Sequence, residues 1–521
     1  MGKIYETKIV RFDGGMSDDP RQLLNSVGSL IKHFDVFSNP FKMSPYRSTE
    51  ADTATNVSST DAKQYDIRDF RLGLDGKLYA LGKNASGYPK VMKKTDPTTG
   101  NWLSASGGNA SNTDGEGNAV RIPGCFIEWQ GAFWFFQGTN QIAKCTLAGT
   151  ITNSVSTVGS TIASVAQGVV GADNNLYLFY NNKVVRITPA GSVSDAVFSG
   201  VPSDMRIVSV CNYGTYIALG CAYGTDTATK PFGRSQVFIW DMIQTAVSSD
   251  AVDWGDGALR VLANVEGRIV GVTDKYLSST LGLARGSMVI RMWAGGIPQV
   301  MKDIVANQTV TADTATVTRF PSDVVVKGSK MYWVASLPFA LSTATESTHH
   351  LGIWVFGRKN VESNFTLSLD YVEEGVDTAN FFINSFGNAG DYWFINHSAD
   401  GSVTKTDDSA NYTFTSIYES QIFNDGNSSV TKKLNGVTVF TAPMPTAGQV
   451  VLKYRKDEET SFTTIFTHAT DNSISHSAIN IEATGVTLPE FKEIIFRIES
   501  TGGAEITGFK YKSEEVDLDI Y

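Results

Sequence analysis

Cysteine, basic charge and long apolar runs are all scarce in this chain of 521 residues. Its four cysteines are too few for a disulfide scaffold, and no histidine lies at zinc-ligand spacing from them, so we expect buried, reduced thiols. Acidic residues outnumber basic ones by 53 to 43, and the net charge of −10 argues against broad binding to a nucleic-acid backbone. No apolar run reaches the roughly 18 residues that a membrane-spanning helix needs.

Signals for targeting and for disorder are missing as well. The first ten residues, MGKIYETKIV, lack the apolar segment of a secretory signal, and Glu6 stands where N-myristoylation requires Ser or Thr. With 42% apolar residues, 48 Gly and 15 Pro, the composition is neither disordered nor collagen-like. These features predict a folded protein made in a reducing cytoplasm, although Cys211 and Cys221 could face each other across a hairpin.

Short aromatic and β-branched runs, bounded by Gly, Asn, Asp and Ser, are abundant and typical of β-strands. Seven of them begin within three residues of a turn residue, and each has a mixed apolar and basic run downstream that would be its partner strand. They are spaced 39 to 62 residues apart, close to the roughly 40–50 residues of a four-stranded propeller blade. The turn residues are Gly76, Gly131, Asn175, Gly214, Gly267, Gly328 and Gly390.

This repeat predicts an all-β fold with a β-propeller of about seven blades over residues 61–410. Runs such as FWFF and MYWV are apolar at consecutive positions, which suits sheets that are covered on both faces by their neighbours. Radial stacking would also leave only short strand edges open to solvent. A linear array of unrelated β-sandwiches gives similar runs and stays open as the alternative, because the repeat carries no family-specific tag.

Residues 411–521 have a different character, with 9 Lys and Arg against 15 Asp and Glu, a local charge of −6. Apolar and polar residues alternate there with a period of two between frequent turn signals, as in FKEIIFRIES. This pattern indicates strands with one wet and one buried face, and it predicts a C-terminal antiparallel β-sandwich. The final SEEVDLDIY fits an edge strand, a tail laid on a neighbouring subunit, or a solvated terminus.

Residues 1–60 combine turn signals with short apolar pieces and cannot build a core of their own. We expect them to form an N-terminal arm that donates a strand to the propeller or binds another subunit. Within this arm, Leu, Ile and Val recur at spacings of three and four between Asp19 and Phe34, and Pro20 suits a first helical position. Gly28 weakens that helix, so a buried extended segment is the alternative.

Patterns of known catalytic and metal sites are incomplete in this sequence. Sialidase-type propellers carry repeated S-x-D-x-G-x-T-W boxes, but only the imperfect string Ser398-Ala-Asp400-Gly401 is present. Adjacent acids such as Asp457 and Glu458 would point to opposite faces of a strand or into solvent. The segments 112–117 and 253–257 resemble calcium loops without the closing Glu, so we interpret them as tight turns. We therefore expect no enzymatic activity, no catalytic residue, no cofactor and no bound metal.

The N-terminal arm carries a set of short motifs: Arg11-Phe12-Asp13-Gly14-Gly15, Asp18-Asp19-Pro20-Arg21, Phe34-Asp35 and Asn39-Pro40. With them the chain resembles tail-associated virion structural proteins of tailed bacteriophages. The match is clearest over residues 1–50 and is architectural elsewhere. The layout is also similar to that of the tail nozzle proteins of short-tailed phages, which combine a β-propeller with further β domains.

The resemblance implies a structural subunit of the virion tail, made in the host cytoplasm. It would be a ring-forming nozzle or tail-tip subunit that guides DNA exit and host attachment. Its expected partners are copies of itself (a hexamer being one expected form), other tail proteins, and a host surface glycan or receptor. Genomic DNA would pass through an acidic channel without specific binding, because like charges repel. A receptor- or glycan-binding adhesion protein is the alternative, and a polysaccharide-degrading enzyme is a third reading. The expected subunit contacts are Arg11, Phe12, Asp13, Asp18, Asp19, Arg21, Asp517, Asp519 and Tyr521.

Overall fold

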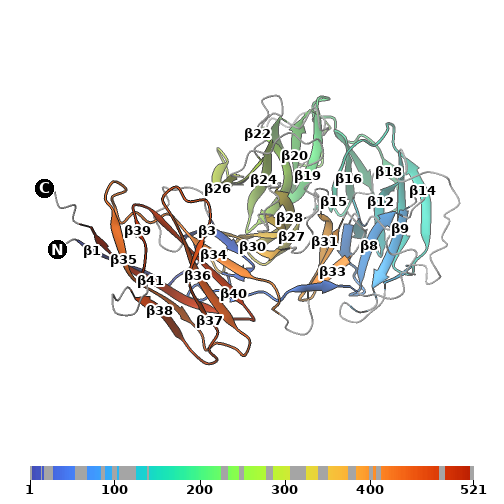
Figure 1. Ribbon diagram of the computed structural model, residues 1–521. Coiled ribbons are helices and arrows are strands. Elements are labelled where there is room, and N and C mark those ends of the chain that lie inside the picture. The colour runs from blue at the N-terminus through green and yellow to red at the C-terminus, as the bar shows by residue number, and fades with distance from the viewer. Residues whose placement is uncertain are drawn as a thin grey trace. The chain divides into compact units, whose positions relative to one another are not determined.

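All regular elements in the described part of the chain are β-strands (Figure 1), which confirms the all-β prediction. None of the described residues forms a helix that could cross a membrane. The computed structural model describes residues 3–12, 14–16, 27–52, 67, 69–83, 89–94, 96, 102–104, 125–137, 140–224, 233–245, 251–276, 286–305, 324–337, 350–372, 383–397, 403–406, 412–479 and 487–516.

Two compact units make up the chain, and each is assembled from separated segments. Unit 1 consists of Met1–Ser48, Ile353–Glu374 and Asp407–Tyr521, and unit 2 of Thr49–Gly352 and Gly375–Thr406. Strand β29 (His350–Gly357) crosses the sequence boundary between them.

Unit 2 contains six four-stranded antiparallel sheets and the hairpin of β27 (Val325–Lys327) and β28 (Lys330–Leu337). Five sheets use four consecutive strands, whereas the sixth takes its outer strand, β6, from a distant part of the sequence. The sheets are β7 (Asp69–Leu72), β8 (Leu78–Lys83), β9 (Pro89–Lys94) and β10 (Trp102–Ser104); β11 (Ile127–Trp129), β12 (Ala132–Gln137), β13 (Gln141–Thr146) and β14 (Ile151–Thr157); β15 (Val165–Val170), β16 (Leu176–Tyr180), β17 (Lys183–Ile187) and β18 (Val193–Ser194); β19 (Met205–Tyr213), β20 (Tyr216–Tyr223), β21 (Arg234–Trp240) and β22 (Ala251–Asp256); β23 (Ala258–Val265), β24 (Arg268–Tyr276), β25 (Gly286–Trp293) and β26 (Gln299–Val305); and β31 (Ile383–Ala389), β32 (Tyr392–His397), β33 (Val403–Thr406) and β6 (Thr49–Ala51).

The seven strands predicted after turn residues are all present, as β8, β12, β16, β20, β24, β28 and β32. Each is the second strand of its group, and a turn connects it to the first strand. Gly131, with a φ of 73°, shows why the turn residue is specified: the left-handed conformation costs other residues about 1 kcal/mol or more.

The order of the sheets in unit 2 is propeller-like, because it returns to its start. First strands of successive sheets pack together from β11 to β15, β19 and β23, and β27 and β28 lie between β23 and β31. Strand β31 then packs against β7, the first strand of the first sheet.

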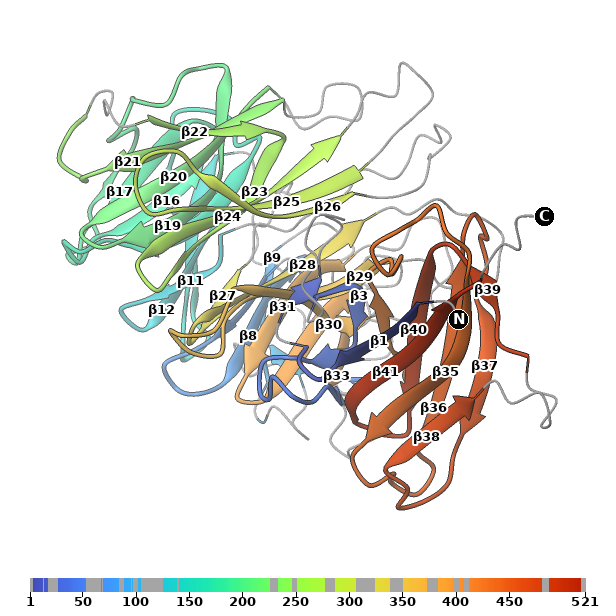
Figure 2. The same cartoon turned by 90° about the vertical axis from the view of Figure 1, so that its left-hand side faces the viewer.

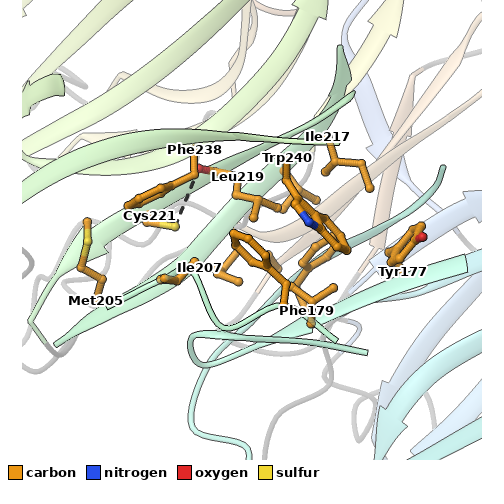
Figure 3. Packing of buried hydrophobic residues seen from close by; sticks show 14 residues of the cluster. Tyr177, Phe179, Met205, Ile207, Ile217, Leu219, Cys221, Phe238 and Trp240 are labelled. Atoms are coloured by element: carbon orange, nitrogen blue, oxygen red, sulfur yellow. Dashed lines mark hydrogen bonds between the residues drawn. The ribbon is translucent and has the colours of Figure 1, made fainter. Parts of the chain in front are cut away.

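The core of unit 2 is divided among the interfaces between successive sheets. Figure 3 shows the cluster between the third and fourth sheets, where Tyr177 and Phe179 meet Ile217, Leu219 and Trp240. Comparable clusters fill the neighbouring interfaces. The second, third and fourth sheets are therefore buried on both faces, which explains why strands such as β12 are apolar at consecutive positions.

One turn of unit 2 occurs twice with the same bonds. In the first sheet, Tyr79 donates its hydroxyl hydrogen bond to Asp75 Oδ2 (3.0 Å), and in the third sheet Tyr177 donates to Asp173 Oδ2 (2.7 Å). The same carboxylates accept the backbone N–H two residues further on. The shared letters, G-x-D-[GN]-x-L-Y, thus specify a turn that fixes the start of a second strand.

Unit 1 contains two larger sheets that join distant segments. In the first, β1 (Ile4–Ile9) pairs antiparallel with β41 (Ile506–Glu515), as Figure 2 shows, followed by β35 (Lys432–Thr441) and β38 (Ser475–Ile479), with β39 (Glu490–Phe491) also on β35. In the second, β30 (Thr366–Val372), β3 (Val27–Lys32), β34 (Ser416–Ser420), β40 (Ile494–Thr501), β36 (Gln449–Lys456) and β37 (Thr463–His468) lie in this order, with β2 (Gly15–Met16) on β3. The small pair β4 (Phe34–Asp35) and β5 (Ser44–Pro45) completes the unit.

The helix considered between Asp19 and Phe34 is wrong where the structure describes it, because residues 27–32 form strand β3. Residues 19–26 lie outside the described part. Strand β3 is central in its sheet, with β30 and β34 as neighbours, so pairing from both sides outweighs the helical spacing of its apolar residues. The extended alternative holds for this segment.

A buried polar cluster in unit 1 ties the N-terminal segment to β30. Tyr46 donates a hydrogen bond to Asp370 Oδ2 (2.6 Å), and Ser368 donates to Asp370 Oδ1 (2.5 Å). The His33 ring packs in the same cluster, with Nδ1 3.0 Å from the Asp370 carbonyl oxygen. Burial lowers the pKa of His33 to about 4, so its ring is neutral at neutral pH.

Candidate functional site

Of the residues expected to contact other subunits, the structure describes Arg11 and Phe12. Phe12 is completely buried, donates its backbone N–H to Pro40 (2.9 Å), and packs edge-on against Tyr418. Its side chain thus belongs to the core of unit 1. Arg11 is exposed and lies over the Phe41 ring at 5.8 Å. The others, Asp13, Asp18, Asp19, Arg21, Asp517, Asp519 and Tyr521, lie outside the described residues, and their role stays a prediction.

The clearest surface feature of unit 2 is a set of exposed apolar side chains at one end of its sheets. In each antiparallel sheet, the first-to-second and third-to-fourth turns lie at the same end, which we call the hairpin end. Leu74, in a first-to-second turn, is 82% exposed, and Ile297, in a third-to-fourth turn, is 86% exposed. All large apolar side chains that are exposed in the described part of unit 2 lie at this end: Leu72, Leu74, Tyr216, Ile243, Ile297, Val300 and Val326.

Hydrogen bonds between neighbouring sheets hold these turns together. The Leu74 N–H donates to Glu128 Oε2 (2.7 Å), which joins the first sheet to the second. Burial raises the pKa of Glu128, and this bond opposes that shift. Further bonds run from Asn212 Nδ2 to the Val170 oxygen (3.0 Å), from Asn264 Nδ2 to the Asn212 oxygen (3.0 Å), and from Lys327 Nζ to the Gly390 oxygen (3.1 Å). These bonds therefore fix the turns that carry the exposed apolar side chains relative to one another.

Aromatic rings add to the hairpin end at the fourth and fifth sheets. Tyr213 and Trp293 pack with their ring centroids 5.7 Å apart, and Trp293 donates its indole N–H to Gly296 (2.9 Å). Tyr216, paired with Tyr213 across the turn, is 45% exposed. Exposed aromatic rings can stack on sugars or insert into a protein partner.

A cluster of polar side chains joins the first strands of the first three sheets. Asp69 is buried and accepts a backbone hydrogen bond from Phe126 (3.2 Å) and a short one from the Gln167 side chain. Arg71 lies 3.4 Å from Asp69 and donates to the Phe126 carbonyl oxygen. Since each of these groups bonds backbone or neighbouring strands, the cluster joins three sheets and has the geometry of a structural tie.

Other candidate residues are engaged in structural bonds. Asp253, from the calcium-like segment, is in strand β22 and forms an ion pair with Arg234, so that prediction of a tight turn is wrong at this residue. Asp457 accepts the N–H groups of Lys492 and Glu493. Cys211 lies opposite Ala218, not Cys221, and all four cysteines are buried and outside any disulfide. The described residues contain no group of three or more His, Cys, Asp and Glu side chains arranged for a metal ion, and residues 112–117 lie outside them.

The exposed apolar surface at the hairpin end was not predicted from the sequence, although large apolar residues inside turn segments could have indicated it. Leu74 precedes Asp75-Gly76, and Ile297 follows Gly295-Gly296, so both are large apolar residues inside turns. Polar residues normally occupy such positions, so a large apolar residue inside a turn is a local signal for an exposed apolar side chain.

No family model and no curated protein matches this chain. Among solved structures, virginiamycin B lyase from Staphylococcus aureus is 11% identical, with a TM-score of 0.40, and the match covers 69% of this chain and 98% of the lyase. The WD40 domain of Pan2 from Neurospora crassa is 10% identical, with a TM-score of 0.40, over 71% and 96%. An exo-β-1,3-galactanase from Phanerochaete chrysosporium is 13% identical, with a TM-score of 0.32, over 89% and 99%.

The expectation that this chain is not an enzyme is corrected by these similarities. Several of the similar structures are glycoside hydrolases and one is a lyase, so the exclusion of an enzyme on the basis of sequence patterns does not stand. The patterns that we searched for belong to particular families, and catalytic groups on a propeller-like fold come from separate strands and loops without a common spacing. Similarity at 10–13% identity assigns neither a substrate nor a catalytic residue to this chain.

Proposed function

We propose that the chain is a structural subunit of a bacteriophage tail, and that the hairpin end of unit 2 binds the neighbouring tail subunits. The observation that carries the proposal is the gathering of exposed apolar side chains at this one end. Soluble monomers rarely expose a contiguous apolar patch of more than a few hundred square ångströms, and larger ones mark interfaces. The N-terminal motifs Arg11-Phe12-Asp13-Gly14-Gly15 and Asp18-Asp19-Pro20-Arg21 support the tail assignment.

The finer architecture belongs to the same proposal. Seven first strands follow one another around unit 2, which supports a propeller of seven blades: β7, β11, β15, β19, β23, β27 and β31. In unit 1, Phe496 on β40 contacts Phe509 and Tyr511 on β41, at centroid distances of 4.9 and 5.2 Å. This contact between the two sheets supports a β-sandwich. Such a subunit would form a closed ring, with each copy presenting the same two surfaces to its neighbours.

The tail assignment is tested on intact particles. Virions purified by density gradient would contain the chain by peptide mass spectrometry, and antibodies against it would label the tail in electron micrographs. Absence of the chain from purified particles overturns the assignment.

The role of the hairpin end is tested separately by paired substitutions. Leu74→Asp with Ile297→Asp would place charge on the proposed interface and reduce incorporation into particles at least about tenfold, as desolvating unpaired charges is costly. The matched control, Leu74→Met with Ile297→Met, keeps the apolar character and should incorporate normally. Normal incorporation of the Asp variant would show that this surface is not the interface, whatever the outcome for the tail assignment.

Recognition of a receptor or glycan is the second candidate, and the aromatic group Tyr213, Tyr216 and Trp293 favours it. A glycan array probed with the purified chain would then give hits that Tyr216→Ala removes. An array without hits counts against this candidate.

A further inference from the structure

Two histidine rings in unit 1 stack at a corner of the chain where it passes from one sheet to the other. Strand β37 pairs with β36, whereas β38 pairs with β35 in the other sheet. His468 is the last residue of β37 and His476 is the second residue of β38. Their ring centroids are 3.6 Å apart, with an angle of 30° between the planes. The stack therefore joins the two edge strands across the corner.

The environment of His476 favours a neutral ring. The residue is 3% exposed, and its buried Nδ1 has no hydrogen-bond partner. Its Nε2 lies 3.4 Å from Thr441 Oγ1, while His468 Nε2 lies 3.1 Å from Ser473 Oγ. Burial, together with the neighbouring His468 ring, lowers the pKa of His476 to about 4.

Few charged groups lie near the two rings, so a proton added to His476 would be poorly compensated. Across the strands, His468 lies opposite Val450 on β36 and His476 lies opposite Val439 on β35. Both valines are buried and apolar. In the connection 469–474 the charged residue is Asp471, which is exposed and accepts a hydrogen bond from Thr446 (3.3 Å). The preceding loop, TAPMPTAG at 441–448, carries no charged side chain. A protonated His476 ring in the closed form would therefore have no counter-ion next to it.

We propose that the His468–His476 stack is an acid-sensitive latch, which holds β38 and the connection 469–474 closed at neutral pH and releases them in acid. The rest of unit 1 stays folded during this release. Protonation stabilises the open form, in which His476 reaches water, because the closed form offers its Nδ1 no acceptor. The result is a local opening at the outer edge of unit 1 and not global unfolding.

The pH range follows from the pKa of His476 in the two forms. A solvated histidine titrates near 6.5, and the closed form holds the pKa of His476 near 4, so protons bind the open form first. The stabilisation of the closed form is complete above about pH 6.5 and declines until about pH 4. Within this range the ratio of open to closed form rises about tenfold for each pH unit.

Hydrogen exchange of the full chain, corrected for the intrinsic pH dependence of exchange, tests the latch. Peptides covering 463–479 should lose protection about 40-fold between pH 6.5 and pH 4.5, while peptides from β40 and β41 keep theirs. His476→Phe keeps a stacked ring but removes the group that takes up the proton, so its 463–479 segment should lose much less protection over the same range. His33→Asn, at a distant buried histidine of the same unit, is the control and should leave the response of 463–479 unchanged.

Three results would overturn the latch. Unchanged protection of 463–479 at pH 4.5 excludes acid opening, and an equal loss in His476→Phe excludes protonation of His476 as its cause. Simultaneous loss of protection in β40 and β41 would mean global acid unfolding. If His476→Phe does not fold, His476→Gln gives the same comparison, because glutamine does not take up a proton in this pH range.

Discussion

Lys94 and Asp52 form an ion pair that is almost completely removed from solvent, with Nζ 2.6 Å from Oδ1 and exposed side-chain fractions of 1% and 4%. Asp52 directly follows β6, the outer strand of the sheet β31-β32-β33-β6, and Lys94 ends β9 in the first sheet. Trp102 donates its indole N–H to the same carboxylate (2.8 Å). The pair therefore ties the first and last sheets of unit 2, in sequence order, to each other.

Removing one partner of this pair should be more harmful than removing both. Asp52→Ala leaves the Lys94 ammonium buried without its counter-ion, and we expect a loss of about 3–5 kcal/mol in the free energy of unfolding. The double variant Asp52→Ala with Lys94→Met should recover part of this loss, because no charge then remains buried. Urea denaturation of the three proteins measures the effect. Equal stability of the single and double variants would contradict a buried, coupled pair.

Lys432 offers a second test, because its buried ammonium group is held by backbone oxygens alone in the bonds that the structure shows. The residue is fully buried, and Nζ donates to the backbone oxygens of Asn427, Val430 and Lys492 at 2.6 to 3.1 Å. Lys432→Met would leave these carbonyls without a donor and cost about 3 kcal/mol. The neighbouring Lys433→Met is the control and should cost less than about 1 kcal/mol. Thermal unfolding followed by circular dichroism distinguishes the two.

His33 should make the whole molecule sensitive to acid. Its folded pKa of about 4 lies below the value near 6.5 of the unfolded chain, so unfolding takes up a proton between these values. The contribution of neutral His33 to the free energy of unfolding is fully present above about pH 6.5, and about 3 kcal/mol of it is lost by pH 4. His33→Asn, which tolerates the φ of 63° at this position, should have a shallower decline in melting temperature from pH 7 to pH 4.5. An unchanged slope would mean that His33 does not titrate on unfolding.

The repeated turn predicts that two distant substitutions have matching effects. Asp75→Ala and Asp173→Ala each remove the acceptor of a tyrosine hydroxyl and of a turn N–H. Each should cost about 1–2 kcal/mol, since hydrogen bonds to a charged group contribute more than neutral ones. Guanidinium unfolding of both variants checks the match, with Asp195→Ala, which removes a different Tyr–Asp bond, as comparison. A strong effect of only one would show that the turns are not equivalent.

Local features of this fold could be predicted from the sequence, and features that depend on distant pairing could not. The second strands were visible because their aromatic runs follow turn residues such as Gly131 and Gly390, and both signals lie within a few residues. The pairing of β1 with β41 and of β3 with β30 has no local signal, because the partners are hundreds of residues apart. The apolar residues of the hairpin end form a surface only once separate turns are brought to one side.

The pairing of β6 with a strand from far along the sequence affects how this protein folds during its synthesis. Residues 49–51 emerge early, but their partner in β33 is synthesised some 350 residues later, and β1 must wait still longer for β41. During this interval the nascent chain exposes unpaired strands that a chaperone could hold or a protease could cut. A translation product that stops before residue 403 lacks the partner strand of β6 and cannot complete this sheet. Premature termination would therefore leave unpaired strand edges that promote aggregation.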